Sequence, residues 1–529
     1  MPDVRSSTVG DVVRRSRARH PHRVAVRFAD RSWTYAELDD AASAAAVELL
    51  ALGLRHGDRV AAYGRNSDAY LIAFLGCARA GLVHVPVNYS LTGTELAYLL
   101  AQSGSTALLF DPALEPAVDA AARADTSGNG EDGGGKDGED AATGRLGRLC
   151  RLALRDAPGS LLERVTGADV TAPDVEVADE DLAQLLYTSG TTSRPKGAMM
   201  THRALVHEYL SCIQALDLTA ADEPLHVMPL YHSAQMHVFL LPYLAVGATN
   251  HLVEAPEAGD ILRRIEADRH GAFFAAPTLW VAIANHADLA TRELGSLRKA
   301  FYGASIMPGP VLERLRTALP DLGFYNSFGQ SEIGPLATVL RPEQHADRPA
   351  SAGRSVLFVE FRVVDAEGVD VAPGELGEIV YRSPQLTTGY WDKPEETAEA
   401  FRDGWFHSGD LVRVDDEGYI FVIDRIKDVI NTGGVLVASR EVEDALYTHP
   451  AVAEVAVIGT PDPKWIEVIT AVVVLKEPAE PTELIDHVRG RIAGFKVPKR
   501  VHVVDELPRN ASGKLLKRLL RQDLAPDQP

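Results

Sequence analysis

The stretch Leu182-Ala-Gln-Leu-Leu-Tyr-Thr-Ser-Gly-Thr-Thr-Ser-Arg-Pro-Lys-Gly197 changes from apolar to polar within a few residues. Its first part, 182–186, is mostly apolar and predicts a buried strand, whereas 187–197 holds hydroxyl residues, glycines, a proline and two cations. A strand that ends in such a loop offers backbone N–H groups, hydroxyls and positive charge to a single anion. The stretch therefore predicts a polyphosphate-binding loop, with a solvated surface loop as the alternative when it is taken alone.

This loop does not have the residue order of a Walker P-loop. The Walker motif places Gly-Lys-Ser/Thr at the start of a helix, whereas Lys196 follows Pro195 and precedes Gly197. The glycines still let the backbone approach an anion closely, and the hydroxyls donate hydrogen bonds without adding bulk.

Outside the loop, the chain alternates strand and helix patterns. The first predicted unit is a strand, a helix that stops at Gly81 and a second strand, at residues 59–63, 68–80 and 82–87. Such a βαβ unit is typical of a parallel sheet with helical cover. The alternation continues with strands predicted at 106–110, 226–228, 272–275 and 299–302, and with helices predicted at 204–215, 236–244 and 310–318.

Two changes of composition divide the rest of the chain. Asp125–Gly147 is rich in Gly, Asp and Glu, has no aromatic residue, and predicts a disordered surface insertion. From about Gly374 the pattern is all-β, with strands predicted at 377–382, 410–415 and 419–423. After 424–428 the pattern is compact α+β, with helices predicted at 439–448, where Ser439 is the expected N-cap, and at 483–492, and strands at 452–457 and 470–475.

The predicted fold class is therefore α/β. A chain of 529 residues is too long for one core. We expect a large N-terminal domain of several subdomains, with parallel-type sheets and a β-rich subdomain, and a small mobile α+β C-terminal domain. The predicted bounds are 1–424 for the large domain with its insertion at about 125–147, 425–428 for a hinge, and 429–529 for the small domain.

Composition excludes several classes of function. The net charge of −21 argues against nucleic acid and anionic membrane surfaces as partners. The three widely separated cysteines suit buried thiols in a reducing cytosol. No run of about 18 apolar residues and no apolar signal segment is present, so we expect a cytoplasmic protein without a membrane span.

Three later motifs are modest when each is taken alone, because each is typical of a solvated turn. They are Tyr325–Glu332 (YNSFGQSE), Trp405–Asp410 (WFHSGD) and Pro508–Lys514 (PRNASGK). Together with the 187–197 loop, in this order and at these separations, they resemble the adenylate-forming enzymes: acyl-CoA synthetases, peptide-synthetase adenylation domains and luciferases. The resemblance runs from about Val24 to Leu520, apart from the acidic insertion, and is greatest to bacterial fatty-acyl-CoA ligases.

The resemblance implies a reaction in two steps. A carboxylate attacks the α-phosphate of ATP to give acyl-AMP and pyrophosphate, and a thiol, usually that of CoA, then displaces AMP. ATP, Mg²⁺ and CoA are therefore the expected cofactors and co-substrates. Two anions meet in the first step, so electrostatic stabilisation of the transition state is needed. Lys514 resembles the catalytic lysine that contacts the carboxylate and the α-phosphate, although an exposed lysine is the alternative without the motif.

The resemblance also assigns the other nucleotide-binding residues. Glu332 resembles the acid that helps to hold Mg²⁺, which keeps few protein ligands. Phe328 stands where relatives usually stack a tyrosine on adenine, with a core aromatic as the alternative. The remaining expected contacts are Thr188, Ser189, Gly190, Thr191, Thr192 and Lys196 for the β- and γ-phosphates, Ser331 for the α-phosphate, Asn326 for adenine, and Asp410 with Arg425 for the ribose.

In this family the small domain rotates between the two half-reactions. Lys427 matches the hinge position, and Gly433 with Gly434 matches the segment that lines the thiol tunnel in the second step. A narrow pantetheine channel is consistent with backbone that lacks side chains. The segment Val435–Ser439 departs from the polar sequence of many relatives, and Ile466 stands where they often have glycine.

The acyl substrate is predicted from the segment Met228–His237. His232 matches an aromatic position that gates thiol access and takes part in catalysis, although a histidine that caps the following helix is the alternative. Ser233 to Gln235 provide no acid for an amino group, which disfavours amino acids. The other expected pocket walls are Phe239, Thr278, Tyr302, Gly303 and Ala304, which are mostly apolar or small and favour a fatty or aryl monocarboxylic acid.

The leading hypothesis is an ATP-dependent acyl-CoA ligase. The alternative in the same class delivers the acyl group to a carrier-protein phosphopantetheine thiol. A luciferase-like oxygenase and a non-catalytic acyl or nucleotide binder are further alternatives, the binder being disfavoured because Lys514, Glu332 and Asp410 are all present. The expected partners are a small carboxylic acid and CoA or a carrier protein, and a homodimer is left open.

Replacing Lys514 tests its assignment as the catalytic lysine of the first step. Lys514→Ala should slow acid-dependent pyrophosphate release by about 100-fold or more, because it removes a charge from the transition state. Thioester formation from supplied acyl-AMP and CoA should stay within about twofold of the unmodified protein. An equal loss in both assays would contradict the assigned role.

Overall fold

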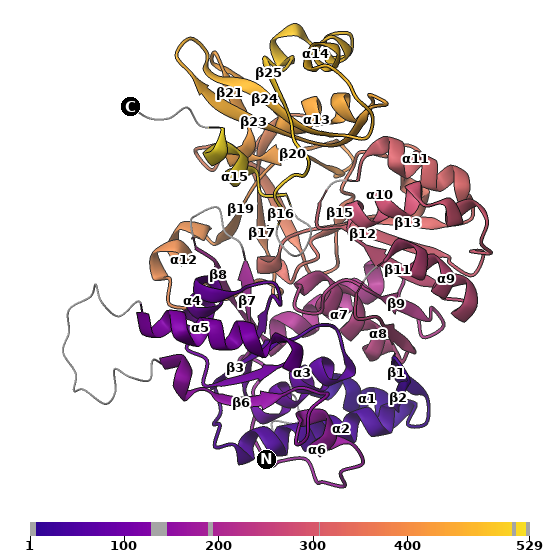
Figure 1. Cartoon of the computed structure of the whole chain (residues 1–529), viewed down its shortest axis with the longest axis vertical. Coiled ribbons are helices and arrows are strands. Elements are labelled where there is room, and N and C mark those ends of the chain that lie inside the picture. The colour runs from indigo at the N-terminus through magenta and orange to yellow at the C-terminus, as the bar shows by residue number, and fades with distance from the viewer. Residues whose placement is uncertain are drawn as a thin grey trace, which may run out of the picture.

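A computed structural model describes residues 7–127, 145–188, 194–255, 257–305, 307–509 and 515–524. The chain forms a large N-terminal domain of helices and mainly parallel sheets, and a smaller C-terminal domain, orange to yellow in Figure 1, packs at one end of it. The predicted α/β fold class is confirmed. None of the helices within the described ranges is long and apolar enough to cross a membrane.

The first sheet has six strands in the order β6-β5-β3-β4-β7-β8. Neighbouring strands run parallel except for β7 and β8, which are antiparallel. The strands are β3 (Arg59–Tyr63), β4 (Val83–Val87), β5 (Ala107–Phe110), β6 (Cys150–Ala153), β7 (Leu182–Thr188) and β8 (Lys196–Thr201). Strand β8 therefore forms one edge of this sheet, directly after the predicted phosphate loop.

The second sheet has nine strands in the order β15-β14-β13-β12-β11-β9-β10-β1-β2. Its central strands, from β13 to β1, are parallel, and antiparallel strands lie at both ends. The strands are β1 (Val24–Phe28), β2 (Arg31–Thr34), β9 (Pro224–His226), β10 (Asn250–Leu252), β11 (Ala272–Ala275), β12 (Lys299–Gly303), β13 (Gly323–Phe328), β14 (Thr338–Leu340) and β15 (Arg354–Ser355).

Two five-stranded sheets complete the fold. The antiparallel sheet of the large domain consists of β16 (Glu360–Val364), β17 (Leu376–Arg382), β18 (Phe401–Arg402), β19 (Trp405–Val414) and β20 (Ile420–Arg425). The sheet of the small domain consists of β21 (Ile430–Thr432), β22 (Val435–Val437), β23 (Val452–Asp462), β24 (Ile466–Leu475) and β25 (Arg500–Val503). The Asp424 carboxylate at the end of β20 accepts hydrogen bonds from Ser439 N–H and Oγ–H, at 2.8 and 2.7 Å, and so joins the two domains.

Helices pack on the sheets of both domains. They are α1 (Asp11–Arg19), α2 (Tyr35–Ala51), α3 (Asp68–Ala80), α4 (Gly93–Gln102), α5 (Glu115–Ser127), α6 (Leu161–Val165), α7 (His202–Ala215), α8 (Leu241–Val246), α9 (Ala258–Asp268), α10 (Pro277–Asn285), α11 (Gly309–Ala318) and α12 (Pro394–Ala400), with α13 (Ser439–Tyr447), α14 (Pro481–Arg489) and α15 (Lys517–Asp523) in the small domain. A π-helical segment, Ala234–Leu240, precedes α8.

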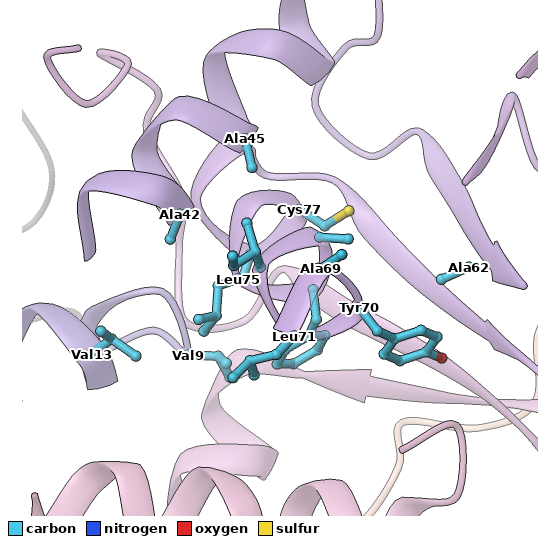
Figure 2. Packing of buried hydrophobic residues seen from close by; sticks show 14 of the residues in the cluster. Val9, Val13, Ala42, Ala45, Ala62, Ala69, Tyr70, Leu71, Leu75 and Cys77 are labelled. Carbon is cyan, nitrogen blue, oxygen red and sulfur yellow. The ribbon is translucent and has the colours of Figure 1, made fainter. Parts of the chain in front are cut away.

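The main core lies around α3, which is buried on almost every side. Figure 2 shows Leu71 and Leu75 of this helix among side chains of α1, α2 and the first sheet. Helix α2 is rich in buried alanines, and a Cβ on Gly76 would lie 2.6 Å from the Cβ of Ala45. Small residues at this crossing therefore allow α2 and α3 to approach closely.

Most predicted elements are present, and their bounds differ by a few residues. The helix at 68–80 ends at Gly81, which has a φ of 66°. Three expectations were wrong. The helix predicted at 236–244 is divided between the π-helical segment and α8. Trp405–Asp410 belongs to strand β19 and is not a turn. The N-cap of α13 is Ala438, because Ser439 is already helical and donates to Asp424.

The predicted insertion needs a correction at both ends. Residues 128–144 lie outside the described part of the chain, but helix α5 extends to Ser127 and a 3₁₀ turn covers Arg145–Arg148. Leu146 is buried in the core beneath α4 and α5, and its N–H donates to the Asp125 carboxylate at 3.0 Å. The composition of the segment does not indicate these contacts, because a single apolar side chain, Leu146, anchors it in the core.

Leu146 and the segment 128–144 should therefore respond differently to mutation. Leu146→Ala should lower the free energy of unfolding by about 2–5 kcal/mol because it leaves a cavity. Replacing 128–144 by a short glycine linker should change Tm by less than about 2 °C, since residues 125 and 146 are already in contact. Thermal unfolding followed by circular dichroism measures both effects. An equal loss in the two variants would contradict the corrected boundary.

Candidate active site

The candidate site lies where several parallel strands of the second sheet end. Strands β11, β12 and β13 end at Ala275, Gly303 and Phe328, and Gly303 pairs with Ser327 across the sheet. Ligands of open α/β sheets bind outside the carboxyl ends of the strands. Glu332 follows β13 in a 3₁₀ turn, Ser331–Ile333, at this edge.

Glu332 is buried, and two segments distant in sequence hold it. The Thr188 hydroxyl at the end of β7 and the Tyr390 hydroxyl each donate to Glu332 Oε1 at 3.1 Å. The backbone N–H of Thr387 donates to the Glu332 carbonyl oxygen at 2.8 Å. The carboxylate of Glu332 thus lies directly beside the start of the predicted phosphate loop.

Lys196 lies at the other end of that loop. It begins β8 and pairs with Thr188 of β7, so the two residues flank the loop. Its Nζ lies 5.1 Å from the centre of the Tyr390 ring, over the ring face. Ser189, Gly190, Thr191 and Thr192, which were predicted to contact the phosphates, lie outside the described residues.

Ser331 connects Glu332 to the segment that contains His232. The hydroxyls of Ser331 and Ser233 are 2.9 Å apart. His232 Nδ1 accepts a hydrogen bond from Ala234 N–H at 3.3 Å, so the histidine is half-buried at the start of the π-helical segment. Such π-helical turns are frequent at functional sites. The geometry allows both readings of His232, as a cap of this turn and as a wall of the acyl pocket.

Asp410 and Arg425 form an ion pair between β19 and β20. Arg425 Nε lies 2.7 Å from Asp410 Oδ1, and the Asp410 side chain is buried. The Arg425 guanidinium also donates to the Ser408 carbonyl at 3.1 Å. The same carbonyl accepts a hydrogen bond from Gln330 Nε2 at 3.5 Å. Gln330 therefore links the predicted ribose-binding pair to the Glu332 segment.

The two predicted adenine contacts both lie on β13. Asn326 is half-buried and donates through Nδ2 to the Ser351 carbonyl at 3.0 Å. Phe328, the last residue of the strand, is also half-buried and pairs with Thr338 of β14. A fully packed core aromatic would be more deeply buried, so the position of Phe328 is compatible with contact to a ligand.

The predicted walls of the acyl pocket do not lie together. Phe239 is buried against Phe274 and Phe301, with ring centres 4.3 and 5.0 Å away. Tyr302 is buried on the opposite face of the sheet, where its hydroxyl lies 3.0 Å from His345 Nε2. Successive side chains of a strand point to opposite faces, so Phe239 and Tyr302 belong to different cores.

The other predicted walls are at or near the strand ends. Gly303 ends β12, and a Cβ at this position would lie 2.2 Å from the Ser327 carbonyl oxygen. Ala304 is exposed and has a φ of 64°, a left-handed conformation that is uncommon outside glycine. Thr278 is exposed in α10. Gly303 and Ala304 thus keep the edge of the sheet low in bulk beside Ser327.

The predicted residues of the second step lie in or next to the small domain. Gly433 and Gly434 form the exposed turn between β21 and β22, with φ values of 66° and 87°. Lys427 is exposed in the 3₁₀ turn Ile426–Asp428, between β20 and β21. Lys514 lies outside the described residues.

The sequence did not indicate two residues that hydrogen-bond to the segment after Glu332, namely Glu208 and Gln385. Buried Glu208 of α7 accepts the Leu336 N–H at 2.9 Å and the Gln385 amide at 2.5 Å. Gln385 also donates to the Ile333 and Leu336 carbonyls. Burial raises the pKa of Glu208 well above its ordinary value and favours the neutral acid. Neither residue lies in a recognisable motif.

Tyr390 was also missed, although a signal for it exists. It ends the sequence Thr387-Thr388-Gly389-Tyr390, which is rich in hydroxyls and glycine like the predicted phosphate loop. Burial, together with the adjacent Glu332 carboxylate, raises the pKa of the Tyr390 phenol well above its ordinary value. The hydroxyl therefore stays protonated and acts as a hydrogen-bond donor at neutral pH.

The donor set fits a hard cation that shares its coordination sphere with phosphate. No group of three or more His, Cys, Asp or Glu side chains within the described ranges could hold a metal ion by itself. Mg²⁺ does not need such a group, because it usually takes one or two carboxylates together with phosphate oxygens and water. Glu332, beside the start of the predicted phosphate loop, is the carboxylate that would hold such a cation.

Comparisons with known proteins agree with this geometry. The family model of the AMP-binding enzymes matches residues 13–391, and the model of their C-terminal domain matches 441–514. A feruloyl-CoA synthase of Amycolatopsis sp. is 40% identical over 512 residues, which cover 96% of this chain and 97% of that protein. The long-chain-fatty-acid–CoA ligase FadD13 of Mycobacterium tuberculosis is 32% identical over 504 residues, covering 94% and 95%. The structure of the anthranilate CoA ligase AuaEII with anthranoyl-AMP matches with a TM-score of 0.88 at 26% identity, covering 98% and 97%.

The fold and the site therefore define an adenylate-forming enzyme. The chain belongs to the AMP-binding enzyme family with its C-terminal domain, and it is an AMP-forming acid–CoA ligase. It uses ATP to form an acyl-AMP with release of pyrophosphate, and it transfers the acyl group to CoA. The carrier-protein alternative is not favoured, since the relatives above are CoA ligases.

The close approach at Gly303 can be tested directly. Gly303→Ala should lower the free energy of unfolding by about 1–3 kcal/mol, because the added Cβ meets a backbone carbonyl that cannot move without shifting β13. It should also reduce adenylation, since β13 carries the Glu332 segment. Gly295→Ala is the matched control, as a Cβ there meets nothing within 4 Å. Urea unfolding and pyrophosphate release measure the two effects, and equal behaviour of the variants would contradict the packing argument.

Proposed function

We propose that this ligase activates monocarboxylic acids with an aromatic body in preference to fatty acids, with Mg²⁺ bound through Glu332 in the first step. One observation carries the assignment of the site. The Glu332 carboxylate is bonded to Thr188 beside the phosphate loop, and its neighbour Ser331 is bonded to Ser233 beside His232. These two contacts support a site in which the phosphate loop, the α-phosphate contact Ser331 and the acyl-pocket segment at His232 lie together.

The first step requires that two anions approach each other. Arg194 and Lys196, both at the C-terminal end of the loop, supply positive charge, and Lys514 adds a cation when the small domain presents it. Ser331 supplies a hydroxyl to the α-phosphate, Asp410 accepts the ribose hydroxyls, and Arg425 holds Asp410 in place. Asn326 and Phe328 contact adenine. Mg²⁺, when bound, neutralises phosphate charge.

The second step requires a different face of the small domain. The turn at Gly433 and Gly434 is exposed and carries no side chain, which suits a channel for the pantetheine arm of CoA. Lys427, exposed between β20 and β21, is the hinge of the exchange, with domain bounds at 424 and 429. The two half-reactions are then separated by domain rotation, which acts as a gate.

The choice of acid rests on the relatives and on the chemistry of the pocket entrance. Identity is 40% to the feruloyl-CoA synthase and 32% to the long-chain fatty-acid ligase. Ser233, Ala234 and Gln235 provide no carboxylate to pair with an amino group, so α-amino acids remain disfavoured. An aryl propenoic acid such as ferulate combines a single carboxylate with a flat apolar body.

A panel of acids tests the proposal. With ATP, Mg²⁺ and CoA, ferulate should give a kcat/KM about tenfold or more above that of dodecanoate, because a pocket shaped for a ring fits an alkyl chain poorly. Pyrophosphate release measures the first step, and loss of the free CoA thiol measures the second. Malonate and phenylalanine serve as negative controls for a second carboxylate and for an amino group.

The result that would overturn the substrate assignment is a higher kcat/KM for dodecanoate than for every aryl acid tested. Equal rates of thiol loss and pyrophosphate release with ferulate would support CoA as the acceptor. Pyrophosphate release that continues without consumption of CoA would contradict it.

A further inference from the structure

The segment Gln385–Trp391, here called the clasp, connects the antiparallel sheet of the large domain to α12. It lies along the free edge of β8, as an added piece of strand. Met199 N–H donates to the Gly389 carbonyl at 2.9 Å, and Thr388 N–H donates to the Met199 carbonyl at 3.0 Å. Trp391 N–H donates to the Gly197 carbonyl at 2.8 Å. In Figure 1, α12 lies next to β8, in agreement with these bonds. These hydrogen bonds therefore fix the clasp in position relative to β8, the strand that begins with Lys196.

The same clasp holds the Glu332 segment. Thr387 N–H bonds to the Glu332 carbonyl, and the Gln385 amide bonds to the carbonyls of Ile333 and Leu336. The Thr387 hydroxyl bonds to the Met199 carbonyl at 2.9 Å. One short segment thus sets the distance between β8 and the turn that carries Glu332. These two parts belong to different sheets, and the site needs both of them.

Tyr390 is the member of the clasp that contacts both functional side chains. Its hydroxyl donates to Glu332 Oε1 at 3.1 Å, and its ring face lies 5.1 Å from Lys196 Nζ. A phenol can orient a carboxylate without neutralising it, and an aromatic face can seat an ammonium without forming an ion pair. Tyr390 therefore holds Glu332 and Lys196 without pairing either with an opposite charge, and both side chains can pair with charges on ligands.

The two oxygens of Glu332 have different surroundings. Thr188 and Tyr390 both donate to Oε1, and within the described residues no side chain or N–H is hydrogen-bonded to Oε2. Two donors on one oxygen fix the rotation of the carboxylate plane. The oxygen left over is the one available to a cation.

We propose that Tyr390 is a positioning residue for the first half-reaction. Its hydroxyl fixes the orientation of the Glu332 carboxylate, so that Oε2 would be the oxygen available to Mg²⁺, and its ring face holds the Lys196 ammonium at the end of the phosphate loop. This inference rests on the proposed metal role of Glu332 and adds a residue that the sequence motifs did not indicate. Outer partners of a metal-binding carboxylate commonly change metal affinity by about 10–100-fold when they are removed.

Tyr390→Phe is the sharpest test, because it removes the hydroxyl and keeps the ring. The Mg²⁺ concentration for half-maximal pyrophosphate release should rise about tenfold, and kcat at saturating Mg²⁺ should return to within about twofold of the unmodified protein. Calorimetric binding of ATP without any acid gives a second readout. The tightening of ATP binding by Mg²⁺ should shrink in the variant, while ATP binding in EDTA should stay unchanged. An unchanged Mg²⁺ requirement would overturn the role of the hydroxyl.

Tyr390→Leu tests the ring. Tyr390→Leu should weaken ATP binding in EDTA as well, since it removes the aromatic ring over which the Lys196 ammonium lies. Equal ATP affinity of the Phe and Leu variants in EDTA would overturn the role of the ring. Tyr243→Phe is the matched control, because that buried hydroxyl also donates to a carboxylate, Asp222 Oδ2 at 3.0 Å, outside the site. It should leave the Mg²⁺ requirement unchanged.

Two further measurements separate this inference from its premise and from misfolding. Glu332→Gln should raise the Mg²⁺ requirement at least as much as Tyr390→Phe. If Glu332→Gln leaves it unchanged, the metal role of Glu332 fails; if only Tyr390→Phe leaves it unchanged, the positioning role alone fails. Thioester formation from supplied acyl-AMP needs no nucleotide metal and should persist in Tyr390→Phe. A parallel loss of that second step would show general damage and contradict a specific positioning role.

Discussion

The buried carboxylate of Glu332 is the constraint on which the rest of the site depends. A buried charge is costly unless hydrogen bonds compensate for lost water. Its donors come from the end of β7 and from the segment that follows β17, while Glu332 itself follows β13. The end of β7 and the segments that follow β13 and β17, which belong to three different sheets, must therefore converge at this point. The arrangement of the large domain thus places the Glu332 carboxylate beside the start of the predicted phosphate loop.

Much of the fold could be predicted because its signals are local. The βαβ unit ending at Gly81 and the change from β7 to the polar loop each lie within a short window of sequence. Each of the loop motifs that indicated the family is also short, although their order extends from residue 187 to residue 514. The failures concern contacts between distant segments. Phe239 and Tyr302 looked like walls of one pocket, but a sheet separates them. Tyr390, Glu208 and Gln385 act through partners that no spacing rule connects.

The turn after β21 shows how one motif can contain two different requirements. Both glycines have positive φ, but a Cβ at Gly433 would lie 2.8 Å from the Trp465 ring, whereas at Gly434 it meets nothing within 4 Å. Gly433 is therefore fixed by conformation and by contact, and Gly434 by conformation alone. Ile466 beside Trp465 has a φ of 67°, a strained state for a β-branched residue. The strain lies next to the turn assigned to the thiol step.

Among the described residues, the side chains that hydrogen-bond to the Glu332 carboxylate are neutral, and this neutrality has a physical reason. An arginine or lysine bonded to Glu332 would orient it equally well, but it would also compete with a cation for the carboxylate charge. Hydroxyls from Thr188 and Tyr390 orient without competing. Behind the turn, the raised pKa of Glu208 favours the neutral acid, so it adds little negative charge to repel phosphate. An ion pair is present instead between Asp410 and Arg425, the pair predicted to bind the ribose hydroxyls, which carry no charge. The distribution of charge at this site thus follows from what each carboxylate must bind.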